Sequence, residues 1–345
     1  RLCRPGDFPP VTEDRRFALL LTGLSLVTLG LFAASLLIGP AGLRIGESLN
    51  ALLFGGAGHE ATVLVMREIR LPRAILGLMV GASLGLSGAV LQGYLRNPLA
   101  EPGLIGISGS ASLGAVLAIY TGMAAALPLA LPLMALAGAL LAVLVVFAIA
   151  GRRGGSLTVI LAGIAVSSLA GALVSLALNL SPNPFAALEI VFWMLGSLAD
   201  RSMQHVGLAA PFMLVGWLLL AGAGRGLDAL TLGEDAAAAL GVRLGRVRLL
   251  AVVGTALAVG AATAVAGAIG FVGLVVPHLL RPLVGAQPSR LLPASALGGA
   301  ALLLASDLAV RLIAPDRDLK LGVVTALVGA PFFVWLVLKT RRETL

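Results

Sequence analysis

The stretch from Arg70 to Leu113 contains a helix-length apolar run that ends in a proline-containing turn. No charged residue occurs from Ala74 to Leu95, and Arg96-Asn97-Pro98 follows this run directly. About twenty apolar residues suffice for a helix to cross the hydrocarbon core of a bilayer. The residue before a proline is biased away from helical geometry, so the helix is expected to end there. A second apolar run starts at Gly103. The stretch therefore predicts two membrane helices joined by a sharp turn. Small residues such as Gly81, Gly85 and Gly88 recur within the first helix and predict close helix packing.

Composition extends this interpretation to the whole chain. Of its 345 residues, 59% are hydrophobic and 12% are charged, and the mean hydropathy is +1.04. These values are typical of a polytopic membrane protein and exclude a water-soluble domain. The net charge of +8 is spread between the apolar runs, which indicates membrane topology rather than nucleic-acid binding. One cysteine, three histidines and the absence of HExxH and CxxC motifs predict no metal site.

The apolar runs predict an all-α fold of about ten spans, with some allowance for kinks. We expect a tail at residues 1–16, one permease domain at 17–340 and a tail at 341–345. The inside-positive rule favours both termini inside, because that orientation places most of the 24 lysines and arginines there. The predicted spans are Phe17 to Ile38, Ala74 to Leu95, Gly103 to Tyr120, Ala124 to Ala150, Leu157 to Leu180, Val206 to Ala223, Leu249 to Ala266, Gly270 to Leu283, Leu291 to Val310 and Leu321 to Leu338.

Three separated motifs resemble one known family. The first combines Arg70-Leu71-Pro72-Arg73 with Arg96-Asn97-Pro98-Leu99-Ala100-Glu101-Pro102; the others are residues 267–281 and 322–333. Together they resemble the FecCD-type permeases, the membrane subunits of ATP-driven importers for iron chelates, heme and corrinoids. The resemblance implies a type II ABC importer permease fold and a bacterial inner-membrane location. One departure is Asp318-Leu319-Lys320, where the family usually has Glu-Leu-Pro.

Several basic residues on the predicted outer side are candidates for binding a partner protein. The resemblance implies that Arg70, Arg73 and Arg311 dock a soluble binding protein, although such arginines can also simply extend toward water at helix ends. Asp307 lies four residues before Arg311, which puts both side chains on one helix face. We therefore expect this carboxylate to orient or neutralise the arginine.

The predicted inner loop 224–248 contains a short alanine-rich helix. Its acidic start and the glycine after it suit the two ends of a helix. It could rest on the lipid surface, but the resemblance implies that it couples to an ATPase subunit. The coupling residues so implied are Leu232, Gly233, Glu234, Asp235, Leu240 and Gly241.

The resemblance also implies a gate and a channel. An inner gate is expected from the two turns that carry Asn97, Leu99, Gly155 and Ser156. Gln92, Phe192 and Trp193 are candidate channel-lining residues, although aromatic residues at such a position can also anchor the membrane interface.

No GxxxxGK[ST] phosphate loop occurs, so a separate subunit must hydrolyse ATP. The expected assembly is a homodimer of this chain in the lipid bilayer. Its further partners are two ATPase subunits, which bind ATP and Mg, and a periplasmic binding protein. The chain itself is expected to bind no cofactor. The expected cargo is heme, with corrinoid and ferric-siderophore import as alternatives. An ion-coupled secondary transporter is disfavoured because the spans hold few ionisable residues, and an embedded enzyme because no acid, base and nucleophile converge.

Overall fold

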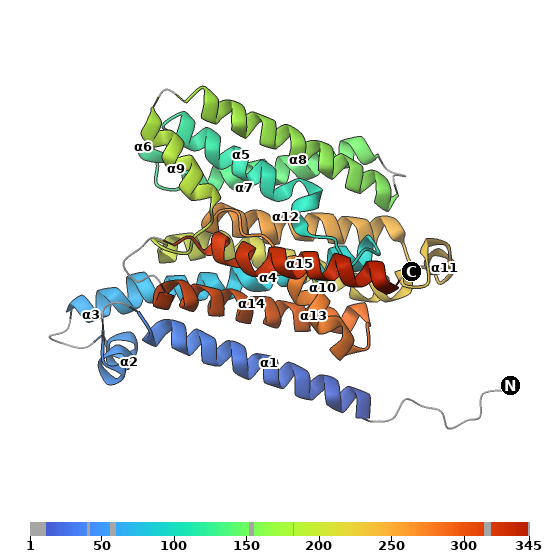
Figure 1. The fold of residues 1–345 in the computed structure, drawn as a ribbon, viewed down its shortest axis with the longest axis horizontal. Coiled ribbons are helices and arrows are strands. Elements are labelled where there is room, and N and C mark those ends of the chain that lie inside the picture. Colours follow the sequence, from blue (N-terminus) through green and yellow to red (C-terminus); the bar gives the residue numbers. More distant parts are fainter. Residues whose placement is uncertain are drawn as a thin grey trace.

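A computed structural model describes residues 12–39, 42–55, 60–151, 155–181, 183–313 and 319–343. Within these residues every regular element is a helix, which confirms the all-α prediction (Figure 1). The longer helices run roughly alongside one another in one bundle. Their bounds are α1 Thr12–Leu37, α2 Ile45–Leu53, α3 Glu60–Leu64, α4 Leu71–Tyr94, α5 Ile107–Tyr120, α6 Met123–Ala126, α7 Ala130–Ala150, α8 Ser156–Asn179, α9 Pro184–Met194, α10 Met203–Leu230, α11 Glu234–Ala239, α12 Leu244–Ala266, α13 Val272–Leu280, α14 Pro288–Ile313 and α15 Leu321–Glu343.

Seven helices in the described part of the chain are long and apolar enough to cross a membrane. They correspond to seven of the ten predicted spans. The other three predicted spans coincide with shorter apolar helices, Ile107–Tyr120, Val272–Val284 and Leu321–Leu336. Hydropathy located all ten segments, but the span predicted from Ala124 to Ala150 is interrupted at residues 127–129, between α6 and α7. Two others are shortened at their starts.

The two shortened segments begin with non-helical backbone. Before α5 the chain forms a turn and a 3-10 segment, Pro102–Ile105, and Gly106 has a left-handed φ of 82°. Before α13, Gly267 and Phe271 have φ values of 74° and 68°. A single left-handed residue interrupts a right-handed helix, so neither segment can be helical along the whole predicted span.

The predicted inner loop 224–248 was too long. Helix α10 continues to Leu230 and α12 already begins at Leu244, so the connection is residues 231–243. Charged residues such as Arg225 and Asp228 do not end a helix, so α10 continues through them. Gly233, with a φ of 103°, directly precedes α11. Helix α1 begins at Thr12, inside the predicted tail 1–16, and α15 extends to Glu343, inside the predicted tail 341–345. The division into a permease domain and two tails stays a prediction. Residues 1–11 and 344–345 lie outside the described residues.

Helix α4 is the central helix of the bundle and is buried over almost its whole length. It packs against α10, α12, α13 and α14. A Cβ added to Gly85 would lie 2.0 Å from the carbonyl oxygen of Ser295 on α14, and one added to Gly88 would lie 1.9 Å from that of Gly273 on α13. The small residues of the sequence therefore mark backbone-to-backbone contacts, as predicted.

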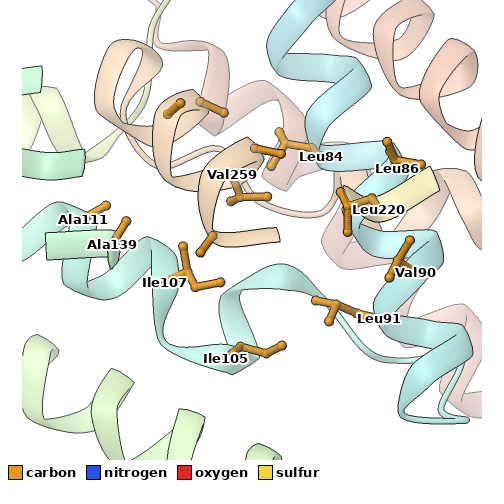
Figure 2. Close-up of a cluster of buried hydrophobic side chains, with 14 of the residues drawn as sticks. Leu84, Leu86, Val90, Leu91, Ile105, Ile107, Ala111, Ala139, Leu220 and Val259 are labelled. Atoms are coloured by element: carbon orange, nitrogen blue, oxygen red, sulfur yellow. The ribbon is translucent and has the colours of Figure 1, made fainter. Parts of the chain in front are cut away.

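Aliphatic side chains fill the space around α4. Figure 2 shows Leu84 and Val90 of α4 in the same cluster as Ile107 of α5 and Val259 of α12. Each is under 10% exposed. This core packs α12 against both α4 and α5.

The bundle has two distinct ends. Helix α11 lies at one of them, and α1 begins and α15 ends at that same end (Figure 1). Helices α2, α3, α6 and α9 lie at the opposite end. We call these the α11 end and the α3 end. The start of α1 and the end of α15 at one end of the bundle agree with an even number of crossings. That the α11 end faces inward stays a prediction.

Candidate functional site

A buried ion-pair cluster lies at the α3 end. Arg73 of α4 donates to Asp307 of α14 through Nε at 2.9 Å and through Nη2 at 2.8 Å, both to Oδ1. Arg311 donates to Oδ2 of the same carboxylate. The Asp307 side chain is 1% exposed. The predicted pairing of Asp307 with Arg311 is confirmed, and Arg73 is a second partner that no sequence spacing indicated.

Two of these arginines also bind the end of α1. Arg70 Nη1 donates to the carbonyls of Leu36 and Leu37 at 3.0 and 2.9 Å. Arg311 Nη1 donates to the Ser35 carbonyl at 2.8 Å. The last carbonyls of a helix have no partner within the helix and carry partial negative charge, so guanidinium groups satisfy them well. The cluster therefore fastens α1 to α4 and α14.

The three arginines are more buried than we expected for residues that dock a soluble protein. Arg70 is 4% exposed, and the side chains of Arg311 and Arg73 are 6% and 19% exposed. They point into the protein rather than toward solvent. Docking of a binding protein by these residues stays a prediction, and a charge reversal at Arg70 or Arg311 would test folding before it tested docking.

The predicted gate turn after α4 is held at several points. Asn97 Oδ1 accepts from the Leu99 amide at 2.9 Å, which is an Asx turn. Ser167 of α8 donates to the Gly103 carbonyl at 3.2 Å. Asn97 is exposed and Leu99 is half-buried. The turn therefore has an exposed tip and an anchored base.

Glu101 forms the strongest anchor of this turn. Its Oε1 accepts from the Phe271 amide at 2.6 Å, at the start of α13. Burial raises the pKa of the Glu101 carboxyl above its ordinary value, and this backbone hydrogen bond acts in the opposite direction. The sequence showed an acid in an apolar turn, but it gave no signal for its partner 170 positions away.

Gln92 does not line an open surface, contrary to the channel prediction. It is 1% exposed and lies between α4 and α13. Its Nε2 donates to the Gly273 carbonyl at 3.3 Å, and its Oε1 accepts from Arg281 Nη2 at 2.8 Å. A buried amide needs such partners. Gln92 and Glu101 therefore hold both ends of α13 through hydrogen bonds.

The second predicted gate turn is described only in part. Gly155 is exposed and precedes α8, which begins at Ser156. Arg152, Arg153 and Gly154 lie outside the described residues. The role of this turn as a gate stays a prediction.

The predicted coupling segment contains one short helix, α11, of six residues. Gly241, with a φ of 84°, ends α11: its amide donates to the Ala238 carbonyl and the Val242 amide donates to the Ala237 carbonyl. This is the Schellman pattern predicted for Gly241. The helix also begins at Glu234, as predicted.

Two large apolar side chains flank α11. Leu232 is 68% exposed and Leu240 is 66% exposed. Between them Ala237 is fully buried, so it fixes the helix against the bundle. A Cβ added to Gly233 would lie 3.8 Å from Arg96 Nη1, which places the segment beside the first gate turn. The start of α11 therefore lies next to the turn that follows α4.

An apolar hollow of about 590 Å³ lies beside the end of α9. Phe271 lies in its wall, and its lining also includes Leu195, Ala268, Gly322, Ala326 and Ala330. Of the two aromatic residues predicted near a channel, Phe192 is 51% exposed and Trp193 is 8% exposed. Lys320 Nζ lies 5.3 Å from the centre of the Phe192 ring. Phe192 is thus half exposed with Lys320 over its ring, whereas Trp193 packs into the protein.

Comparisons with known proteins agree with this arrangement. The model of the FecCD transport family matches residues 26–339. An uncharacterized ABC transporter permease protein, YvrB of Bacillus subtilis, is 38% identical, with 96% of each chain covered. The vitamin B12 import system permease protein BtuC of Salmonella typhimurium is 40% identical, with 96% of this chain and 98% of BtuC covered.

A solved structure has the same fold. It is assigned to a metal-chelate type ABC transporter in an inward-facing conformation. It superposes with a TM-score of 0.83 at 34% identity, covering 93% of this chain and 99% of the other. The match confirms the type II importer permease fold, and the seven apolar helices agree with an inner-membrane protein. The chain therefore belongs to the FecCD transport family and is a membrane permease of ABC importers.

Proposed function

We propose that this chain forms the pathway through which an ATP-driven importer moves heme. The observation that carries the coupling part of the proposal is α11, a capped helix flanked by exposed Leu232 and Leu240. Exposed apolar side chains on a short rigid element suit a protein partner. ATP and Mg would bind to two separate ATPase subunits at this end, and the chain itself would hold no cofactor.

Two further partners complete the proposed assembly. A second copy of this chain would close the pathway, with the apolar hollow beside α9 facing it. A periplasmic binding protein would deliver cargo at the α3 end. Of the three arginines predicted to dock it, Arg73 keeps the most exposed side chain, at 19%.

A broad apolar wall suits a large planar chelate better than a hydrated ion. The hollow is lined almost entirely by aliphatic residues, with Phe271 in its wall, and an exposed aromatic face at Phe192 can stack on a macrocycle. Corrinoid import is the second candidate, because a relative 40% identical to this chain is a vitamin B12 import permease.

Cargo is tested by transport in proteoliposomes that contain the chain, its ATPase and a binding protein. The binding protein is loaded separately with heme, cobalamin or a ferric siderophore, and free ferric ion is a fourth condition. We expect ATP-dependent uptake to be fastest with heme and negligible with free ferric ion. Faster uptake of cobalamin or of the siderophore would refute heme as the cargo and leave the permease function standing.

Replacing Gly241 by valine should uncouple ATP hydrolysis from transport. A left-handed conformation costs a residue with a side chain about 1–2 kcal/mol, so the end of α11 should shift although the added Cβ meets no other atom. The measurement is cargo moved per ATP hydrolysed. Gly245→Val is the matched control, since Gly245 is exposed, has no positive φ and also has free space around it. Equal transport per ATP in both variants would argue against coupling through α11.

A further inference from the structure

An apolar groove of about 840 Å³ opens between α1 and α10. Helices α4 and α14 form its floor through residues such as Leu86 and Leu292. Trp217 of α10 also lines it, and its Nε1 donates to Ser83 Oγ of α4 at 2.9 Å, which fixes the indole. Helix α1 lies at one edge of the bundle (Figure 1), and Thr28 of α1 lines the groove. In a membrane protein this face meets lipid.

The length of the groove along α14 is close to the thickness of one leaflet. Along α14 its lining extends from Ser289 to Ala300, which is about 16 Å at the rise of an α-helix. The hydrocarbon core of a bilayer is about 30 Å thick, so one leaflet contributes about 15 Å. An acyl chain that entered at Ser289 would therefore end near the middle of the bilayer.

Arg225, the basic residue that lines this groove, lies at its α11 end. Arg225 lines it there, is exposed, and makes no ion pair with another described residue. On α1, Arg15 and Arg16 are exposed at the same end. Among the described side chains at this mouth, Asp228 accepts from the Ser289 amide at 2.8 Å, and Asp14 pairs with Arg290 at 2.6 Å. The basic side chains described there outnumber the acidic ones, so these described groups carry a net positive charge.

We propose that this groove binds one anionic phospholipid from the leaflet at the α11 end. Its phosphate lies at Arg225, where a guanidinium can form two hydrogen bonds to phosphate oxygens. One acyl chain lies along the groove between α1 and α10, against Leu86, Trp217 and Ala296. The apolar lining of the groove favours an acyl chain, and the basic residues at its α11 end favour an anionic headgroup.

The test uses the purified full-length chain in mild detergent. Dioleoyl phosphatidylglycerol or dioleoyl phosphatidylcholine is added, and native mass spectrometry counts the lipid retained. We expect one phosphatidylglycerol per chain, held roughly tenfold more strongly than phosphatidylcholine. Arg225→Gln should reduce phosphatidylglycerol retention on the order of tenfold and abolish the preference. Ala221→Phe, which fills the groove from its exposed α10 side, should reduce retention of both lipids.

Arg246→Gln is the matched control, because Arg246 is exposed on α12 and does not line the groove. It should retain phosphatidylglycerol like the unmodified chain. Size-exclusion profiles and thermal unfolding in lipid-free detergent establish that all variants are folded. Equal retention of the two lipids by the unmodified chain would overturn the proposal, as would unchanged retention in both Arg225→Gln and Ala221→Phe.

Discussion

Replacing Asp307 by alanine should destabilise the folded protein by about 3–5 kcal/mol, because it removes one partner from a buried ion pair and leaves the cations behind. Asp307 is 1% exposed and is shared by Arg73 and Arg311. Arg311 also binds the end of α1, so its displacement should loosen that helix as well. The measurement is unfolding in mixed micelles with increasing amounts of a denaturing detergent.

The matched control is Asp14→Ala. Asp14 pairs with Arg290 at 2.6 Å, but its side chain is 85% exposed, and exposed pairs contribute at most about 1 kcal/mol. Combining Asp307→Ala with Arg73→Met should recover part of the lost stability, because one stranded cation is removed. Equal stability of Asp307→Ala and Asp14→Ala would contradict a structural role for this cluster.

Gly85→Val should prevent close packing of α4 on α14. The new Cβ would lie 2.0 Å from the Ser295 carbonyl oxygen, which is backbone and cannot rotate away. Overpacking in a core costs about 1–3 kcal/mol when side chains can adjust; here a whole helix must move, so we expect a loss above that range. The measurement is the yield of monodisperse protein and its unfolding midpoint.

Gly23→Val on α1 is the corresponding control. Gly23 is exposed, and an added Cβ there meets no atom within 4 Å. Both substitutions add the same side chain to a glycine inside a membrane-crossing helix, so they differ in packing alone. A Gly85→Val protein as stable as Gly23→Val would show that the two helices are not held at the distance described.

The helix positions could be predicted because hydropathy is local. Transfer of an apolar run such as Ala74 to Leu95 from water into the membrane is favourable whichever segments pack around it. Its membrane location therefore follows from composition. The end of α11 was equally local, since Gly241 supplies the left-handed residue that a Schellman motif needs. Gly85 and Gly88 announced close contacts, although the sequence could not name the helices they meet.

The orientation of polar side chains could not be predicted, because it depends on partners that only folding supplies. Arg70 was expected to face a partner outside, yet the end of α1 brings unsatisfied carbonyls to it. Gln92 was expected in a channel, yet α13 presents Gly273 and Arg281 to it. In each case a buried polar group pairs with whatever the fold places within reach.

The sequence by itself therefore determined that this is a helical membrane permease, through apolar runs, small residues and three motifs spread along the chain. Only the tertiary structure decided that Arg73 and Arg311 share Asp307, that Glu101 holds α13, and that Arg225 stands at the mouth of a leaflet-deep groove. Transfer of a residue into lipid depends on that residue alone. A hydrogen bond, an ion pair or a groove depends on two or more segments that the fold brings together.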